Sequence, residues 1–472
     1  MHLFTDQPGD EGLPGHERRL AMVAVMTSTT MAVFDGSMVN IALPQIARAL
    51  EVSPGDAVWV ANGYLLSAAM TLAIFAALAP RMGYRALFAA GISLFTLASL
   101  GCALSTSLEM LVVMRLLQGI GGAATLSIAP AILRSIFPGR LLGRILGINA
   151  LLIAANTAIA PVVGGALLSS FGWQWLFAIN LPFGIVALLL TLRVVPVHRS
   201  RINGRFDVAG ALLSTMMLGA VIMASTAFSR PGETGGTLLT PALYGLAAVF
   251  SGIAFVYRQR RATQPLVPLA LFSSARFSLA ALTSLSSFVS QGMTFVALPF
   301  LFQSVYGYSA LTSALLFTAW PVGIVLVAPH AGRLADRYAP AVISTVGLCF
   351  FALGLLLLAL LPDNAPVWDI SLRGLVCGMG FGCFQSPNNR EMLASASREH
   401  SSYASGILAI MRTFGQCLGA AVIGVILSVC APSGTLVQEA FAVRLGLWLA
   451  LCATVLAIVV SLSRLRARPV TH

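Results

Sequence analysis

A single aspartate, Asp35, lies within an apolar stretch whose residues 20–43 carry no other charge. A carboxylate at the centre of a membrane helix costs about 2.5–3.5 kcal/mol even on a mild insertion scale. In a low-dielectric cavity this group can be neutral while the cavity is empty and charged when a cation arrives. A proton and a cationic cargo would then compete for one group, which is the thermodynamic basis of antiport. We therefore predict that Asp35 couples protons to cargo; the alternative is a structural hydrogen-bonding role between helices.

Two methionines share a helix face with this aspartate. Met31 lies four residues before Asp35 and Met38 lies three residues after it, so a helix presents all three side chains on one side. Thioether side chains are polarizable and repack around varied apolar shapes. We expect both methionines to line a substrate cavity.

Two arginines also fall inside apolar stretches. Arg115 lies within residues 110–133, and Gln118 follows on the same helix face. We expect both residues to act with Asp35 in coupling; the sequence leaves open whether Arg115 contacts Asp35 or the backbone, and a structural role is the alternative. Arg412 lies in a later apolar stretch. It is either a partner inside the cavity or a side chain that extends toward the membrane interface.

Four aromatic residues lie near the predicted cavity: Tyr64, Phe288, Phe295 and Trp320. Their rings could hold a lipophilic cation through cation–π contact. The alternative for each is a lipid-facing or core position. We include all four among the candidate cavity residues.

The composition requires a membrane. The chain has 472 residues, of which 58% are hydrophobic and only 9% charged, and its mean hydropathy is +0.89. A soluble domain has about 25% charged residues. Membrane β-strands would show short alternating segments, which the sequence lacks. We therefore predict an all-α integral membrane protein.

Fourteen apolar stretches are long enough to cross the bilayer. They span residues 20–43, 57–79, 86–106, 110–133, 145–169, 173–192, 208–228, 238–257, 277–302, 309–331, 341–361, 366–387, 403–430 and 440–462.

The arginines test this prediction of fourteen spans. All 28 basic residues are arginine. With the N-terminus inside, 22 of them fall on the cytoplasmic side, four (Arg48, Arg230, Arg373 and Arg444) fall on or near the other side, and two lie within spans. This asymmetry follows the positive-inside rule. We therefore expect an even number of spans and two cytoplasmic termini. Because the arginines do not gather on one domain, the net charge of +12 does not indicate a nucleic-acid partner.

Two loops resemble each other. The sequence AALAPRMGYR at residues 76–85 and the sequence GRLADRYAP at residues 332–340 both fit a G-x-L-A-D-R-x-G pattern imperfectly. Each follows the second helix of a set of six, which indicates an internal repeat. The predicted domains are therefore a tail (1–19), a six-helix bundle (20–195), two inserted helices (206–258), a cytoplasmic linker (259–276), a second six-helix bundle (277–463) and a C-terminal tail (464–472).

Several motifs in fixed order carry a resemblance to a known family. FDGSMVNIALP (34–44), RLLQGIGGA (115–123), GINALLIAANTAIAPVVGG (147–165) and WQWLFAINLPFG (173–184) lie in the first half. PLVPLALF (265–272), FQSPNNREML (384–393) and YASGILAIMRTFGQCLGAA (403–421) lie in the second half. Together they resemble the major facilitator superfamily, and within it the fourteen-span drug:proton antiporters.

This resemblance implies a major facilitator fold of two six-helix bundles plus two inserted helices, in the cytoplasmic membrane of a bacterium. It implies a monomeric multidrug efflux antiporter that exchanges protons for small amphipathic compounds by alternating access. Only Asp35 supports a cationic cargo directly. The resemblance also implies gating and structural roles for Arg81, Gly83, Arg85, Pro161, Gly164, Gly165, Asp336 and Arg337. In the first loop, the family pattern has an acid where this chain has Pro80. An ion pair that closes the first half therefore needs another acidic partner, such as Glu391.

Other classes of function lack their motifs. The chain has no lysine, so the ATP-binding pattern G-x-x-x-x-G-K-[ST] is excluded. Neither H-E-x-x-H nor G-x-S-x-G occurs, and the cysteines show no metal-binding spacing. We expect no enzyme activity, no metal and no cofactor, with the proton gradient as the energy source. Two alternatives stay open: a proton-coupled exporter of one specific metabolite, peptide or siderophore, and a non-transporting membrane receptor or scaffold.

Overall fold

The computed structural model describes residues 4, 10, 12–138, 141–197, 206–227, 239–335, 337–395 and 401–466. Within these residues the chain is helical and contains no strand. Fourteen helices are long and apolar enough to cross a membrane. The prediction of a fourteen-span, all-α membrane protein is therefore confirmed.

The observed helices extend most of the predicted spans by a few residues at their ends. The first half of the chain contains α1 (Gly15–Ala49), α2 (Pro54–Met82), α3 (Tyr84–Ala103), α4 (Leu108–Ile136), α5 (Leu142–Ser170), α6 (Trp175–Ala178) and α7 (Asn180–Val194). The inserted pair is α8 (Val208–Ala227) and α9 (Leu239–Arg261). The second half contains η2 (Leu269–Ser273), α10 (Ala275–Phe300), η3 (Leu301–Val305), α11 (Ala310–Leu334), α12 (Pro340–Ala359), α13 (Val367–Ala394), α14 (Ser401–Cys430) and α15 (Leu436–Arg466).

Local sequence sets where several helices begin. Ser53, Ser107, Ser274 and Ser309 each precede a helix and accept a hydrogen bond from a backbone N–H of its first turn. These bonds satisfy donors that a helix cannot satisfy internally. Polar caps at the ends of apolar runs thus separate consecutive spans.

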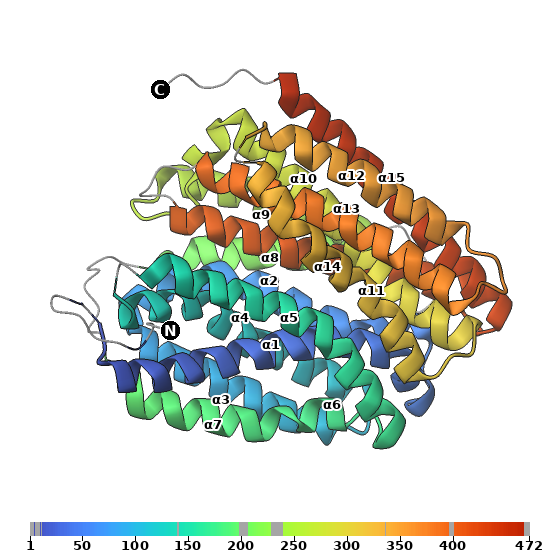
Figure 1. Cartoon of the computed structure of the whole chain (residues 1–472), viewed down its shortest axis with the longest axis horizontal. Coiled ribbons are helices and arrows are strands. Elements are labelled where there is room, and N and C mark those ends of the chain that lie inside the picture. Colours follow the sequence, from blue (N-terminus) through green and yellow to red (C-terminus); the bar gives the residue numbers. More distant parts are fainter. Residues whose placement is uncertain are drawn as a thin grey trace.

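The helices form two bundles (Figure 1). In the first, α4 packs against α2 and α3, while α1 packs against α5 and α7. In the second, α13 packs against α11 and α12, and α10 packs against α14 and α15. In lipid, close van der Waals packing holds helices together, so these contacts keep each bundle together as a unit.

Glycines permit the closest approaches within a bundle. At Gly378 of α13, an added Cβ would lie 2.0 Å from the backbone oxygen of Trp320 in α11. At Gly121 of α4, it would lie 2.6 Å from the backbone nitrogen of Phe95 in α3. Both neighbours are backbone atoms that cannot move aside, so these helix pairs require glycine.

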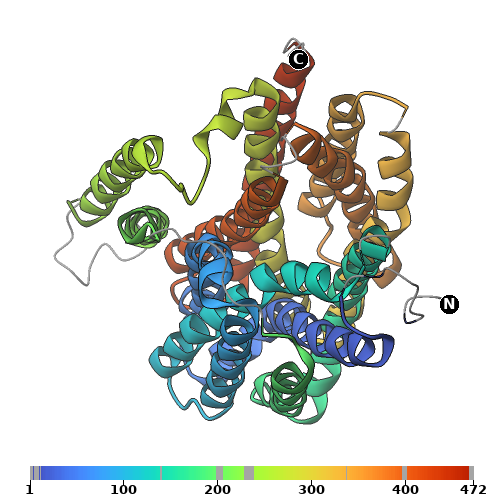
Figure 2. The ribbon, with the colours of Figure 1, turned by 90° about the vertical axis from the view of Figure 1, so that its left-hand side faces the viewer.

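The inserted pair α8 and α9 lies at the side of the molecule, apart from both bundles (left in Figure 2). Its two helices pack mainly against each other, and α8 also contacts α2 and α14, which belong to different bundles. The pair therefore lies beside the junction of the two halves.

The two bundles meet tightly at one end, which we call the Gly55 end. Here an added Cβ on Gly55 of α2 would lie 2.7 Å from the backbone oxygen of Gly424 in α14. An added Cβ on Gly165 of α5 would lie 2.7 Å from the Cβ of Ala314 in α11. The side chain of Gln303 also donates a 2.7 Å hydrogen bond to the backbone oxygen of Ile41. The halves are thus in contact across this end.

The Gly378 contact gives a stability prediction. Gly378→Ala should lower the free energy of unfolding by about 1–3 kcal/mol, because the new methyl group overlaps backbone. Gly245→Ala is the matched control, since an added Cβ on Gly245 meets no atom within 4 Å. Thermal unfolding of the purified variants in detergent measures the difference. Equal melting temperatures for the two variants would contradict the contact.

Candidate functional site

A cavity of about 1420 Å³ lies between the two bundles. Residues from α1, α2, α4 and α5 line one side, and residues from α10, α11, α13 and α14 line the other. Its lining extends along α2 from Tyr64 to Arg81 and along α14 from Tyr403 to Ala420. It does not reach Gly55 or Gly424, so the cavity ends before the closed Gly55 end and extends toward the opposite end, which we call the Arg81 end.

Four of the predicted cavity residues line this space: Tyr64, Phe288, Phe295 and Arg412. The aromatic rings belong to a larger apolar wall. The rings of Phe288 and Phe381 lie 5.4 Å apart, and those of Phe295 and Phe317 lie 4.8 Å apart, both edge to face. This geometry is typical of attractive aromatic pairs, so part of the cavity wall is aromatic and apolar.

Met31, Met38 and Trp320 do not line the cavity, so their predicted positions are corrected. Met38 is fully buried and faces Gly164 of α5, where an added Cβ would lie 3.0 Å from its Cγ. Trp320 is buried between the rings of Phe295 and Phe351, at 5.2 Å and 5.3 Å. Met31 packs within the first bundle. Helical periodicity identified a common face of α1, but that face packs against neighbouring helices.

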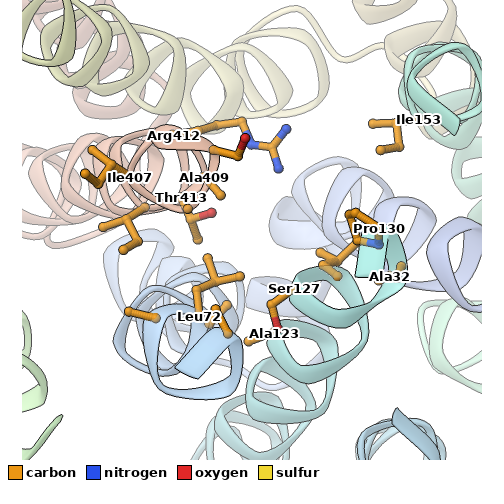
Figure 3. A pocket seen from close by; sticks show the side chains of 18 of the residues that line it. Ala32, Leu72, Ala123, Ser127, Pro130, Ile153, Ile407, Ala409, Arg412 and Thr413 are labelled. Carbon is orange, nitrogen blue, oxygen red and sulfur yellow. The ribbon is translucent and has the colours of Figure 1, made fainter. Parts of the chain in front are cut away.

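Arg412 extends from α14 into the cavity, toward the helices that carry Ser127, Pro130 and Ile153 (Figure 3). Among the described residues, no carboxylate lies within ion-pair distance of its guanidinium, and it donates no hydrogen bond. The sequence left two positions open for this side chain, and the structure selects the cavity.

Asp35 forms a buried ion pair with Arg115. The Nη1 group of Arg115 donates to one carboxylate oxygen of Asp35. Gln118 Nε2 donates to the other oxygen at 2.8 Å, and Arg115 Nη1 also reaches Gln118 Oε1 at 2.6 Å. Asp35 and Arg115 are each only 1% exposed. The three residues that we predicted to act in coupling are thus brought together, although Asp35 lies behind the cavity wall rather than on it.

Two further residues complete this group, which we call the Asp35 cluster: Asp35, Ser99, Arg115, Gln118 and Asn180. Asn180 Nδ2 donates to Asp35 at 3.1 Å, and Gln118 Nε2 donates to Ser99 Oγ at 2.9 Å. Sequence reasoning missed Ser99 and Asn180. The signal for Asn180 was present, because it is a polar residue within the apolar motif WQWLFAINLPFG. The cluster joins α1, α3, α4 and α7.

Arg115 connects the cluster to the cavity. Its Nε donates a 2.8 Å hydrogen bond to the backbone oxygen of Val60 in α2. Its guanidinium also lies 4.6 Å from the centre of the Tyr64 ring and 5.5 Å from that of Phe177. Tyr64 in turn lines the cavity. One ring therefore separates the buried charges from the space where a cargo would lie.

The first predicted gating loop contains a glycine turn, and two of its arginines form hydrogen bonds. Gly83 has φ +96°, a conformation that favours glycine, and it ends α2 and begins α3. Arg81 donates to the side chain of Gln264 and Arg85 donates to the backbone oxygen of Leu192. Arg81 also donates to the backbone oxygen of Ala77.

The structure describes part of the second predicted gating loop. Asp336 lies outside the described residues, and Arg337 is exposed just beyond the end of α11. Glu391, which we considered as a replacement acid for the first half, instead accepts a 2.9 Å contact from Arg464 within the second bundle. Glu391 is thus engaged in its own half.

The helix-5 motif lies where the bundles meet. Pro161, Gly164 and Gly165 are buried in α5. Gly164 faces Met38 of the same bundle, whereas Gly165 faces α11 of the other bundle. Small residues thus permit both contacts of this segment.

Asp207 forms a clasp at the base of the inserted pair, beside the mouth of the cavity. It accepts 3.0 Å contacts from the Gly210 backbone N–H, the Arg258 side chain and the Gln259 side chain. Gln259 also accepts a hydrogen bond from the Val267 backbone N–H. Partial burial favours the neutral acid, but the Gly210 N–H and Arg258 outweigh it and lower the pKa of Asp207.

The fold, the cavity and the buried charges agree with a comparison to protein families. The family model described as Major Facilitator Superfamily matches residues 25–420. The chain belongs to this superfamily. It is therefore a multi-pass membrane transporter.

Similar proteins cover nearly the whole chain. The uncharacterised transporter YebQ of Escherichia coli is 40% identical and covers 90% of this chain and 92% of its own. The multidrug resistance protein Stp of Mycobacterium tuberculosis is 32% identical, covering 87% and 76%. The riboflavin transporter RibZ of Clostridioides difficile is 28% identical, covering 86% and 87%. Among solved structures, a bacterial homologue of the human lysosomal transporter Spinster, in an inward-facing and unoccupied conformation, matches with TM-score 0.70, 16% identity and coverage of 97% and 99%, which shows a shared fold.

The ion pair of the Asp35 cluster gives a second stability prediction. Arg115→Met should cost about 3–5 kcal/mol of unfolding free energy, because it leaves a buried carboxylate without its counter-charge. Adding Asp35→Asn should recover most of this loss, since both charges are then removed. Arg444→Met is the control, because its ion pair with Asp363 is solvent-exposed and worth about 1 kcal/mol or less. Melting temperatures of Arg115→Met, Asp35→Asn, the double variant and the control measure the coupling, and strictly additive effects of the two cluster changes would contradict it.

The Asp207 clasp gives a prediction about pH. Because the pKa of Asp207 is lowered in the folded protein, its contacts stabilise the fold above the unfolded pKa of about 3.9 and are lost only as the pH falls through the lower folded pKa. We therefore expect unchanged protection of residues 206–212 and 259–267 from hydrogen exchange between about pH 8 and about pH 5, after correction for intrinsic rates.

The matching substitution tests the same clasp at neutral pH. Asp207→Asn should increase exchange in both segments, because the acceptor for Arg258 loses its charge. Asp363→Asn serves as the control, since that carboxylate is 85% exposed and pairs with Arg444 outside the inserted helices. Unaltered exchange in Asp207→Asn would mean that the clasp does not hold the base of α8 and α9.

Proposed function

We propose that this transporter exports small amphipathic compounds in exchange for protons. The observation that carries the proposal is a large cavity between two bundles that is closed at the Gly55 end. Its partly aromatic wall suits compounds with flat apolar parts. The resistance protein among its relatives supports export.

The orientation follows from charge. Arg81 and Arg134 lie at the mouth of the cavity, and the positive-inside rule assigns such arginines to the cytoplasm. On this assignment the cavity opens to the cytoplasm in the bacterial inner membrane. Cargo would then enter from inside, as an exporter requires.

Export requires the alternative opening. The contacts of Gly55 and Gly165 with the opposite bundle would have to separate while the Arg81 end closes. Rigid rocking of two bundles about a central site achieves this, since each bundle is packed within itself. The hydrogen bond from Gln303 to the Ile41 backbone oxygen also crosses between the halves and would have to break.

We assign proton coupling to the Asp35 cluster. A proton on Asp35 would remove the counter-charge of Arg115, which is buried and permanently positive. Arg115 would then depend on the Val60 backbone oxygen, Gln118 and the Tyr64 ring. A shift of Arg115 alters Tyr64 and with it the cavity wall. Coupling on this scheme is indirect, because proton and cargo bind on opposite sides of Tyr64.

This scheme removes the argument for a cationic cargo. That expectation rested on Asp35 as a carboxylate exposed to the cargo. Asp35 is absent from the cavity lining. A cation in the cavity would meet the ring of Tyr64 in place of the Asp35 carboxylate. The proposed cargo class is therefore amphipathic. The charged residues that line the cavity determine which charge the cargo carries.

Export of a single metabolite is the second candidate, and the similarity to a riboflavin transporter favours it. A panel of cargoes separates the two. Transport of several unrelated compounds supports a multidrug role, whereas transport of riboflavin alone supports the metabolite role.

The test uses the purified protein in liposomes with an acidic interior. Ethidium, fluorescein, rhodamine 123 and riboflavin are added outside, and both dye uptake and internal pH are followed. We expect uptake of at least one compound to depend on the pH gradient and to release protons from the interior. Asp35→Asn should abolish the dependence on the gradient; it also lowers stability because Arg115 loses its counter-charge, so size-exclusion chromatography checks that the variant still inserts and folds.

Two further variants complete this experiment. Asp35→Glu keeps the acid and should retain gradient-driven uptake, although more slowly. Asp369→Asn removes a carboxylate from an ion pair outside the cluster and should behave as wild type. Normal gradient-driven uptake by Asp35→Asn would exclude Asp35 as the proton site, and no response to any compound would refute proton-coupled export of this class.

A further inference from the structure

The charges of the cavity lining are unequal. Among the described residues, the lining contains the arginines Arg81, Arg134 and Arg412 and one acid, Asp207. Asp207 is already neutralised by Arg258 and by two further donors. No acidic side chain of the described lining is therefore free to receive a cation.

The three arginines differ in position. Arg81 and Arg134 lie at the ends of α2 and α4, where water reaches them, and Arg81 is hydrogen-bonded to Gln264. Arg412 lies in the middle of the α14 stretch that lines the cavity, between Ser405 and Ala420. It is therefore the charge that a cargo meets inside the cavity.

Arg412 lacks a counter-charge in the described part of the chain. A guanidinium does not release its proton in proteins, so Arg412 stays charged in the cavity. An unpaired charge away from bulk water is costly, and an anion that enters the cavity relieves this cost. The planar fork of donors suits a carboxylate or a similar acidic group, which it can bind with two parallel hydrogen bonds.

Apolar and polar groups line the same cavity. Gly415, one turn along α14, lies against Phe288, where an added Cβ would be 2.8 Å from the Phe288 Cβ. Across the cavity, the side-chain oxygens of Asn40 and Asn149 are buried without a hydrogen-bond partner among the described residues. These oxygens are acceptors, so they suit N–H or O–H groups on the cargo.

We infer that Arg412 is the binding residue for an acidic group and that the cargo is an organic anion: an aromatic or lipophilic compound with a carboxylate or comparable acidic group. This inference rests on the proposed transport function and specifies its substrate class. The aromatic wall beside Phe288 receives the apolar part, and a polar substituent that reaches Asn40 or Asn149 would donate a hydrogen bond to its side-chain oxygen. A cationic compound of the same size is disfavoured by repulsion from the guanidinium.

The test compares two probes that share a xanthene ring system. Fluorescein is an anion and rhodamine 123 is a cation. Their dissociation constants are measured by fluorescence anisotropy with the full-length protein in lipid nanodiscs, which requires neither transport nor a proton gradient. We expect wild type to bind fluorescein at least about tenfold more tightly than rhodamine 123.

Three variants locate the preference. Arg412→Gln should weaken fluorescein binding by about tenfold or more and leave rhodamine 123 binding equal or tighter. Arg412→Lys keeps the charge and should retain part of the preference. Arg333→Gln removes the same charge from an exposed position outside the lining and should leave both constants unchanged.

The inference is overturned if wild type binds rhodamine 123 as tightly as fluorescein, or if Arg412→Gln leaves the ratio of the two constants unchanged. Unchanged rhodamine 123 binding in Arg412→Gln shows that the variant is folded. Retained anion preference together with a failure of gradient-driven uptake would count against the proposed function alone, because the binding measurement is independent of proton coupling.

Discussion

The ion pair between Asp35 and Arg115 constrains the whole first bundle. Both charges are buried, so each is tolerated only because the other, together with Gln118 and Asn180, satisfies it. The pair fixes α1 against α4, and its additional bonds draw α2, α3 and α7 to the same point. Under the proposed coupling, a proton on Asp35 would therefore act on the contacts of several helices at once.

Much of the architecture was predictable from composition and charge. Apolar length and the asymmetry of the arginines gave fourteen spans, and the polar residues within apolar runs identified Asp35, Arg115 and Gln118 as a group. The prediction was wrong about the direction in which this face of α1 points. Helical spacing defines which residues share a face, but whether that face meets the cavity or another helix depends on how the bundle is rotated. Met38 and Asp35 therefore lie in the interior of the bundle, although their spacing was read correctly.

The remaining differences have the same origin. Tyr64, Phe288 and Phe295 were identified as cavity residues while Trp320 was placed there wrongly, because an aromatic residue fits a core and a cavity wall equally well. Asn180 was overlooked because its neighbours suggested a family motif rather than a hydrogen-bonding role. Three-dimensional placement was needed to separate the buried acid from the exposed arginine in the cavity, and that separation alters the expected charge of the cargo.

The position of α8 and α9 makes the two flanks of the molecule unequal. The seam between α2 and α14 has α8 beside it, whereas among the described elements no helix pair covers the seam between α5 and α11. A hydrophobic solute dissolved in the bilayer therefore meets the inserted helices at the α2–α14 seam, but it meets the bundles directly at the α5–α11 seam. Entry of such a solute from the side, between the bundles, would be restricted to the flank beside α5.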